Sequence, residues 1–231
     1  MKFIKSYQLF ERKDLYVNKH LNDLYFKLIK SFSNTYNGKN ISIYNNEGTW
    51  IFPIMEMPTP FFLSFTTKVI NAGFGSITTD GNKYPLLQLP FKKEKEILDF
   101  FWKREAKLTF PMAEEIIENS KTTIIHELTH YVDFLKKGSD LPKSVLLGGE
   151  EKEIIKKYYN SYQEVNAYFM QTINYAIEEV NKNKSLLSNF NRFKSYFVSC
   201  MGDSFTQLDD RNKRRILKRI YLLFEELNIL K

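Results

Sequence analysis

Two histidines four residues apart constrain this chain more than any other feature of its sequence. His126 and His130 stand in the run HELTH, and Glu127 directly follows the first of them. On an α-helix, residues i and i+4 lie on the same face, so both imidazoles can bind a single metal ion. The chain contains 3 histidines in all, which makes this match more specific than most short motifs. The alternative is a pair of ordinary histidines on a helix surface.

The residues around the motif predict that it lies on a helix. The apolar pattern runs from residue 121 to residue 137, where Ser120 or Thr122 can cap the start and Gly138 can end the helix. A buried stripe is expected on this helix, formed by Ile124, Ile125, Leu128, Val132 and Leu135. The histidines and the glutamate of the motif would then face a cleft from a rigid element.

Two histidines do not complete a catalytic zinc site, which uses three protein ligands and one open position for water. His20 is the remaining histidine, but it lies far away in sequence within an amphipathic helix. Asp133 shares a helix face with His130, yet side chains at i, i+4 and i+7 span about 10 Å along a helix axis. We therefore expect Asp133 to support the site from outside or to hold the end of the helix, and not to bind the metal.

Glu164 is the better candidate for the third ligand. It lies near the start of the next long helical segment, and a second helix can cross the first and offer its carboxylate to the metal. An alternative exists, because Ser161-x-x-Glu164 also fits a capping box, in which the glutamate reaches back to a backbone N–H group. We favour the metal role, because the motif otherwise lacks its third ligand.

Together, the run HELTHYVDF and the downstream run EVNAY resemble the gluzincin group of zinc metallopeptidases. Thermolysin-like enzymes share the letters HELTH, whereas the aspartate after the second histidine and the E-x-x-A helix are more similar to lethal-factor-type peptidases. The two runs are also similar to small zincin-like proteins encoded by phages. The resemblance covers residues 120 to 170. This resemblance implies a Zn²⁺ ion bound by His126, His130 and Glu164, with Glu127 as the catalytic carboxylate.

The resemblance also implies roles for further residues. Glu127 would take a proton from metal-activated water and later pass it to the leaving amine. Thermolysin-like enzymes place an aspartate four residues after the ligand glutamate, but Tyr168 stands there in this chain, and Asp133 is the candidate to substitute for it. The candidates for a phenol that stabilises the oxyanion are Tyr158, Tyr159 and Tyr162. Each of the three is otherwise an ordinary core or interface aromatic.

Composition and patterning predict an α+β fold. With 231 residues, 43% of them hydrophobic, the chain can bury a full core. One zincin-like domain is expected, with an amino-terminal helix and sheet lobe (1–91) and a helical lobe that carries the metal site (92–231). Helices are expected at residues 11–32, 93–107, 121–137, 150–159, 161–182 and 209–228. Residues 138 to 149 are expected to form a loop.

Short β-branched and aromatic runs predict the strands of the first lobe. They lie at residues 41–44, 49–54, 61–67, 76–79 and 84–89. Asp80-Gly81 between two of these runs is expected to form a hairpin turn. The strands would form a small antiparallel sheet packed on the helical bundle, with an edge strand open to an extended peptide.

Charge and cysteine content limit the partners and the location that we expect. The formal charge of +7 does not by itself indicate nucleic acid, because basic and acidic residues are mixed along the chain. The densest basic cluster is interpreted as a solvated helix face and comprises Arg211, Lys213, Arg214, Arg215, Lys218 and Arg219. Cys200 is the single cysteine, so no intrachain disulfide can form. No signal peptide or membrane span is evident, so we expect a cytoplasmic protein, or a virion-associated one if it is phage-encoded.

Three functional hypotheses follow from these features. The leading one is a zinc-dependent peptidase that acts on a polypeptide substrate. The second is a structural or interaction protein, such as a virion component or a regulatory partner, which retains a zincin fold and binds an assembly partner. The third is a nucleic-acid-binding protein that uses the basic carboxy-terminal helix, and the lack of a recognisable stacking motif disfavours it.

Overall fold

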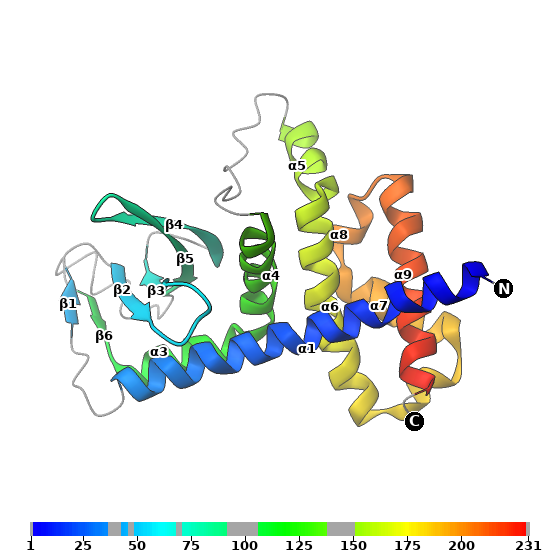
Figure 1. The fold of residues 1–231 in the computed structure, drawn as a ribbon, viewed down its shortest axis with the longest axis horizontal. Helices are drawn as coiled ribbons and strands as arrows, with labels where there is room; N and C mark the ends of the chain where they lie inside the picture. Colours follow the sequence, from blue (N-terminus) through cyan, green and yellow to red (C-terminus); the bar gives the residue numbers. More distant parts are fainter. Residues whose placement is uncertain are drawn as a thin grey trace. The chain divides into compact units, whose positions relative to one another are not determined.

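The computed structural model of the chain describes residues 2–36, 43–45, 49–67, 71–91, 106–137 and 151–229. The chain forms two compact units. We call Asn22–Pro142 the sheet unit, and Met1–Leu21 together with Lys143–Lys231 the helical unit. Helix α1 (Lys2–Tyr36) contributes residues to both (Figure 1). The fold class is α+β, as predicted, whereas a zincin fold and a single domain with lobes 1–91 and 92–231 stay predictions.

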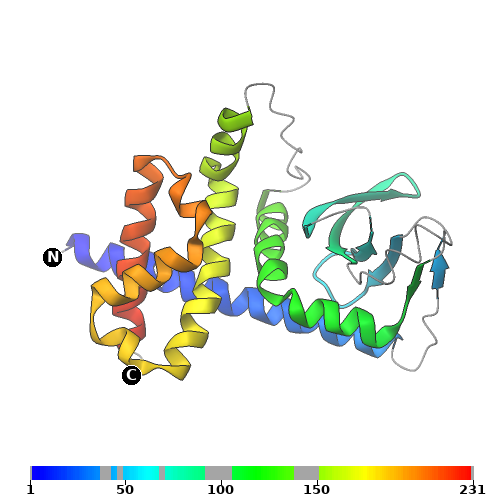
Figure 2. The same cartoon turned by 180° about the vertical axis from the view of Figure 1, so that it is seen from behind.

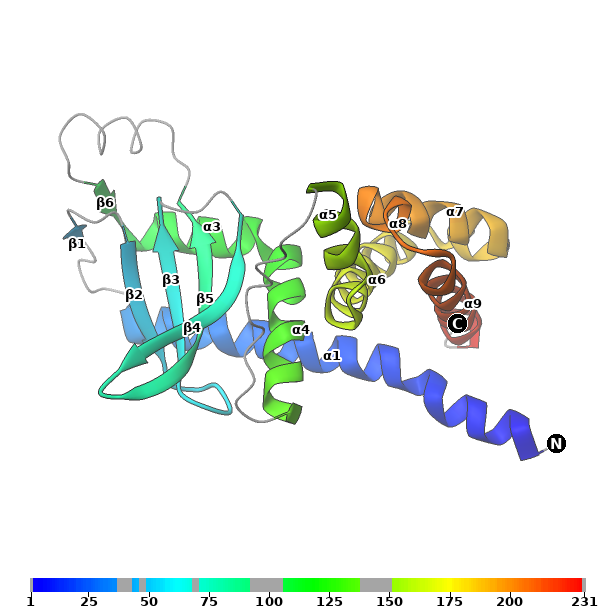
Figure 3. The same cartoon turned by 90° about the horizontal axis from the view of Figure 1, so that it is seen from above.

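A four-stranded sheet with the strand order β2-β3-β5-β4 forms the centre of the sheet unit. Its strands are β2 (Thr49–Ile54), β3 (Phe61–Thr66), β4 (Gly73–Thr79) and β5 (Asn82–Pro90). β2 and β3 are antiparallel, as are β4 and β5, but β3 and β5 are parallel. The expectation of an entirely antiparallel sheet is therefore wrong. The chain passes from β3 to the edge strand β4 and returns as β5 between them (Figure 3).

The turn between β4 and β5 is the hairpin that the sequence predicts. Thr79 pairs with Asn82, which leaves Asp80 and Gly81 as a two-residue loop. Their φ angles are 50° and 75°, and two successive residues with positive φ are what a type I′ hairpin turn requires. Aspartate and glycine adopt this conformation more readily than most residues, so the local sequence is sufficient to specify the turn.

On one face of the sheet, alternate residues of β2, β3 and β5 are buried. Phe52, Leu63 and Leu87 occupy matching positions on three neighbouring strands, and each is at most 3% exposed. The ring of Phe32 on α1 contacts Phe52 and Phe65, with centroid separations of 5.4 Å and 5.9 Å. The second half of α1 therefore covers this face of the sheet.

Two more helices pack in the sheet unit, α3 (Phe110–Asn119) and α4 (Lys121–Lys137). α3 runs along α1 (Figure 2). The Tyr25 hydroxyl on α1 donates to the Ile117 carbonyl on α3 at 3.4 Å, and the Ser33 hydroxyl donates to the Glu114 carboxylate at 3.0 Å. The described residues also include a short antiparallel pair, β1 (Ile43–Asn45) and β6 (Ala106–Leu108).

Helices make up the described part of the helical unit. Besides the first part of α1, they are α5 (Glu151–Asn160), α6 (Tyr162–Lys182), the 3-10 helix η1 (Lys184–Ser188), α7 (Phe190–Met201), α8 (Asp203–Thr206) and α9 (Asp210–Ile229). α6 packs against α5 and α7, and α7 packs against α9 (Figure 3). Arg219 on α9 donates to Asp14 on α1 at 2.8 Å and 2.9 Å, and its guanidinium carbon lies 3.7 Å from the Phe169 ring centroid. Arg219 therefore belongs to the packing of this unit and not to a solvated basic face.

The predicted helices agree with the structure except near the middle of the chain. Those at 121–137, 150–159, 161–182 and 209–228 are confirmed, and the first helix is longer than the predicted 11–32. The sequence pattern misses α3, which is short, and α7, whose aromatic, serine and asparagine residues have weak helix propensity. The helix prediction for residues 93–107 is wrong for its last residues, because Ala106–Leu108 forms a strand. Residues 92–105 and the loop expected at 138–149 lie outside the described residues.

Among the described helices, none combines the length and the apolar composition that a bilayer crossing requires. Cys200 on α7 is a free thiol of intermediate exposure.

Candidate metal centre

Helix α4 carries all five residues of the HELTH motif in a buried stretch. The helix begins directly after α3, where the Ile124 N–H donates to the Ser120 carbonyl at 2.8 Å. His126 is 5% exposed, Glu127 is 8% exposed and His130 is 7% exposed. The interpretation of the histidines as ordinary surface residues is therefore wrong. Burial of two imidazoles and a carboxylate is favourable only if these groups find polar or metal partners.

Most of the apolar stripe predicted for this helix is confirmed. Its buried members are Ile124, Ile125, Leu128 and Val132. Leu135 is half-buried. The polar residues of the motif are buried as well, so α4 is enclosed on both faces over this stretch and does not behave as an amphipathic surface helix.

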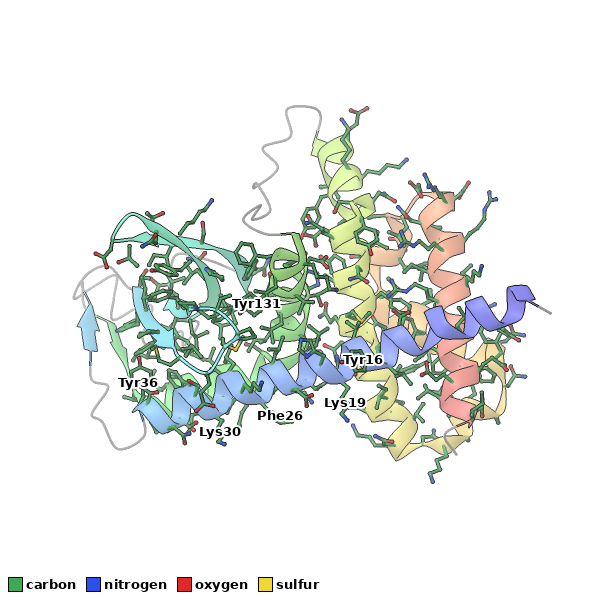
Figure 4. The ribbon with its side chains drawn as sticks, viewed as in Figure 1. Tyr16, Lys19, Phe26, Lys30, Tyr36 and Tyr131 are labelled. Carbon is green, nitrogen blue, oxygen red and sulfur yellow. The ribbon has the colours of Figure 1, made fainter. Side chains whose placement is uncertain are left out.

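Tyr131 fixes α4 to the sheet. It directly follows His130 and is fully buried. Its hydroxyl accepts a hydrogen bond from the Thr59 N–H at 3.2 Å and shares another with the Thr59 hydroxyl at 3.0 Å. Figure 4 labels Tyr131, which lies between α4 and the sheet. Its ring contacts Phe61 on β3 and Phe74 on β4, with centroid separations of 5.0 Å and 6.1 Å. The edge strand β4 therefore lies beside the motif helix.

One nitrogen from each of His126 and His130 and one carboxylate oxygen from Glu164 form a group that could hold a metal ion. These three ligand atoms all lie within 4.8 Å of one another. Atoms bound to one tetrahedral zinc ion at about 2.0–2.1 Å lie about 3.3 Å apart, which is within this limit. Two imidazoles and one carboxylate are also a donor set that zinc accepts with its fourth position open. The residues present therefore fit the implied ion.

Helix α6 presents Glu164 in its first turn. The Ser161 hydroxyl caps this helix by accepting the N–H of Glu164 at 3.3 Å. In a complete capping box, the Glu164 carboxylate would reach back to the N–H of Ser161. That N–H donates instead to the Tyr158 carbonyl at 3.1 Å. The serine half of the box is present and another group satisfies the Ser161 N–H, so capping by Ser161 and metal binding by Glu164 do not exclude each other.

Of the three tyrosines expected near the site, Tyr158 lies beside Glu164. Burial raises the pKa of Tyr158 above its usual value, and the charge of nearby Glu164 raises it further. Tyr159 packs its ring against that of Tyr158, with centroids 5.4 Å apart. Tyr162 is 56% exposed, and its ring centroid lies 4.9 Å from the Arg215 guanidinium carbon. Tyr162 therefore packs on α9.

Tyr168, which stands where thermolysin-like enzymes place an aspartate, is a neighbour of Glu164. The two residues are i and i+4 on α6, so they share a face of the helix. Burial raises the pKa of Tyr168, and nearby Tyr159 and Glu164 add to the shift. The i, i+4 spacing was the available signal, but the thermolysin-like pattern has an aspartate at this position.

Asp133 and His20 do not belong to the group that could hold the metal. Asp133 is 7% exposed and lies nearly one helical turn beyond His130, where helix geometry places it too far along the axis to share an ion with both histidines. His20 is exposed on α1. A role of Asp133 in supporting the site stays a prediction.

No family model, curated protein or solved structure matches this chain. The fold and the site therefore define its class by themselves: an α+β protein with a His/His/Glu group that could hold a metal ion. The resemblance to gluzincins rests on the motif residues, and membership of that group stays a prediction.

Proposed function

We propose that this chain is a zinc-dependent peptidase of gluzincin type. His126, His130 and Glu164 would hold the Zn²⁺ ion, and Glu127 would act as the general base. The observation that carries this proposal is the grouping of three ligand atoms within 4.8 Å of one another. Two histidines and one carboxylate leave the fourth position of a tetrahedral site open, which is the arrangement of catalytic zinc sites.

The position of Glu127 supports its role. A Zn²⁺ ion, when bound in such a site, lowers the pKa of a water molecule and polarises the carbonyl group of the substrate. Glu127 directly follows the first histidine and is 8% exposed, on a helix that is anchored to the sheet through Tyr131. A general base acts within hydrogen-bond reach of the proton that it accepts. The Glu127 carboxylate would accept the proton of the attacking water and return it to the leaving amine.

The edge of the sheet supports a polypeptide as the substrate. β4 is an edge strand, and Phe74 connects it to Tyr131 and Phe134 on the motif helix, at centroid separations of 6.1 Å and 6.5 Å. A Cβ atom added to Gly73 or Gly75 would meet no heavy atom within 4 Å, so there is open space over the sheet at these two glycines, into which side chains of a bound peptide could extend. An extended peptide can add to such an edge through backbone hydrogen bonds.

The proposal is tested by metal analysis and a peptidase assay on the purified full chain. Protein produced in zinc-replete medium should contain about one zinc ion per chain, and it should cleave casein or a peptide library until a strong chelator is added. A chain that binds no stoichiometric zinc would rule out the proposal. Stoichiometric zinc without hydrolysis would favour the alternative of a structural or interaction protein that retains the metal.

A further inference from the structure

Among the described helices of the helical unit, four ends meet at the side chain of Asn160. Asn160 is the last residue of α5 and directly precedes Ser161, the cap of α6. Its Oδ1 atom accepts the N–H of Asp209, the residue before α9, at 2.7 Å. Its Nδ2 atom donates to the carbonyl of Gln207, the residue after α8, at 2.9 Å, and to the Lys156 carbonyl of α5 at 2.8 Å. One amide group therefore joins the end of α5 to the junction of α8 and α9.

The partners of Asn160 determine how its amide group is oriented. A backbone N–H can only donate and a carbonyl can only accept, so Oδ1 must face Asp209 and Nδ2 must face the two carbonyls. Asn212 on α9 adds a second connection, because its Nδ2 atom donates to the Asn160 carbonyl at 3.3 Å and to the Asn160 Oδ1 atom at 3.1 Å. The start of α9 therefore holds both the side chain and the main chain of Asn160.

A short series of contacts connects Asn160 to Glu164. Ser161 directly follows Asn160, and its hydroxyl accepts the N–H of Glu164 at 3.3 Å. The N–H of Ser161 donates to the Tyr158 carbonyl at 3.1 Å, so the cap is also held to the end of α5. Because one peptide bond and the cap link Asn160 to the first turn of α6, its contacts with α8 and α9 restrain the backbone that carries Glu164.

We propose that Asn160 is a positioning residue that holds the first turn of α6, so that Glu164 is in place before the metal ion binds. This inference rests on the proposed zinc site. Ordering a residue costs backbone and side-chain entropy, and the binding free energy of the ion must offset this cost if the ligand is not already held. Groups that orient a metal ligand from outside therefore strengthen the metal affinity.

A purely structural role of Asn160 makes a different prediction. Any hydrogen bond lost in the helical unit lowers the stability of the folded chain, but only a loss at the start of α6 frees Glu164. Asn189 offers a matched control, because its Oδ1 atom also accepts backbone N–H groups at the start of a helix, those of Asn191 at 2.8 Å and Arg192 at 3.4 Å. That helix is α7, which carries no proposed ligand.

The first experiment compares the zinc affinities of the full-length wild type, Asn160→Ala, Asn212→Ala and the control Asn189→Ala by competition with a chromogenic chelator. Asn160→Ala should weaken zinc binding by about tenfold, the lower end of the range for groups that orient a metal ligand. Asn212→Ala should weaken it less, because the contacts of Asn160 with Asp209 and Gln207 remain. Asn189→Ala should bind zinc as the wild type does, although urea denaturation should show that both Asn189→Ala and Asn160→Ala lose stability. Equal weakening of zinc binding in these two variants would leave Asn160 with a structural role alone.

A second measurement, on the metal-free protein, follows amide hydrogen exchange in the first turn of α6. The Glu164 N–H donates to the Ser161 hydroxyl, so Asn160→Ala should speed its exchange and Asn189→Ala should not. Unchanged exchange in Asn160→Ala would overturn the positioning role. If the wild type binds zinc and Asn160→Ala binds it equally well, the positioning role is overturned while the proposed function stands. If the wild type binds no zinc, the proposed function itself fails, and the positioning role, which rests on it, fails with it.

Discussion

The hydroxyl of Tyr131, the residue after the second motif histidine, contacts both the N–H and the hydroxyl of Thr59, at 3.2 Å and 3.0 Å. Thr59 lies in the segment that joins two strands of the sheet. The contact therefore connects the helix that carries the metal ligands directly to the sheet. Because Tyr131 is fully buried, its hydroxyl satisfies polar groups that would otherwise lose their hydrogen bonds.

Tyr131→Phe should lower the free energy of unfolding by about 1 to 2 kcal/mol, since the Thr59 groups lose their partner. Urea denaturation measures this change. The matched control is Tyr36→Phe, which removes an exposed hydroxyl 3.5 Å from the Pro53 carbonyl and should change the stability by less than about 0.5 kcal/mol. Equal effects of the two substitutions would show that the Tyr131 hydroxyl does not anchor α4.

Glu127→Gln should keep the fold and the bound zinc while it removes nearly all peptidase activity, because glutamine cannot accept the proton of the attacking water. Zinc content and cleavage of casein are measured on the same preparation. Glu225→Gln, a substitution of an exposed glutamate on α9, is the control and should leave both unchanged. Wild-type activity in Glu127→Gln would remove Glu127 from the mechanism.

Glu164→Ala should lower the zinc affinity by orders of magnitude, because it removes a ligand. Asp133→Ala should lower it by about 10- to 100-fold, as expected for a group that supports the site from outside. Competition with a chelator measures both. Ser161→Ala removes the cap of α6 and should destabilise the protein by about 1 kcal/mol without releasing zinc. Full zinc occupancy in Glu164→Ala together with loss in Asp133→Ala would place all ligands on the motif helix.

Tyr25 should make the stability fall at alkaline pH. Burial, and to a lesser extent the charge of Glu118, raises the pKa of Tyr25 to about 12 in the folded chain. The unfolded chain loses this proton near pH 10 and the folded chain near pH 12, so the stabilisation is complete below pH 10 and is lost as the pH rises between these values.

Ionisation of Tyr25 should lower the free energy of unfolding by about 2 to 3 kcal/mol between pH 10 and pH 12. Urea denaturation of the wild type and of Tyr25→Phe, from pH 9 upward, should give a steeper loss of stability for the wild type. The absorbance of tyrosinate near 295 nm follows the ionisation itself. Parallel pH profiles for the two proteins would show that Tyr25 ionises as an ordinary tyrosine.

The sequence pattern predicts correctly those features that depend on a few neighbouring residues. The spacing of apolar residues is sufficient to place α4, and Asp80-Gly81 is sufficient to place the hairpin. Ser161-x-x-Glu164 fits a capping box, the alternative considered for this segment, and the Ser161 hydroxyl does accept the N–H of Glu164. In each case, helix periodicity, positive φ or a local hydrogen bond decides the structure within a few residues of chain.

Features that depend on contacts between residues distant in sequence could be established only from the tertiary structure. The parallel pairing of β3 with β5 follows from where β4 lies in the sheet, which no local pattern encodes. The pattern also could not show that Tyr158 lies beside Glu164 while Tyr162 packs on Arg215, because all three tyrosines lie within five residues of one another and differ only in what surrounds them. Spacing along one helix brings the two histidines together, whereas bringing a carboxylate from a second helix to them depends on packing between residues far apart in the chain.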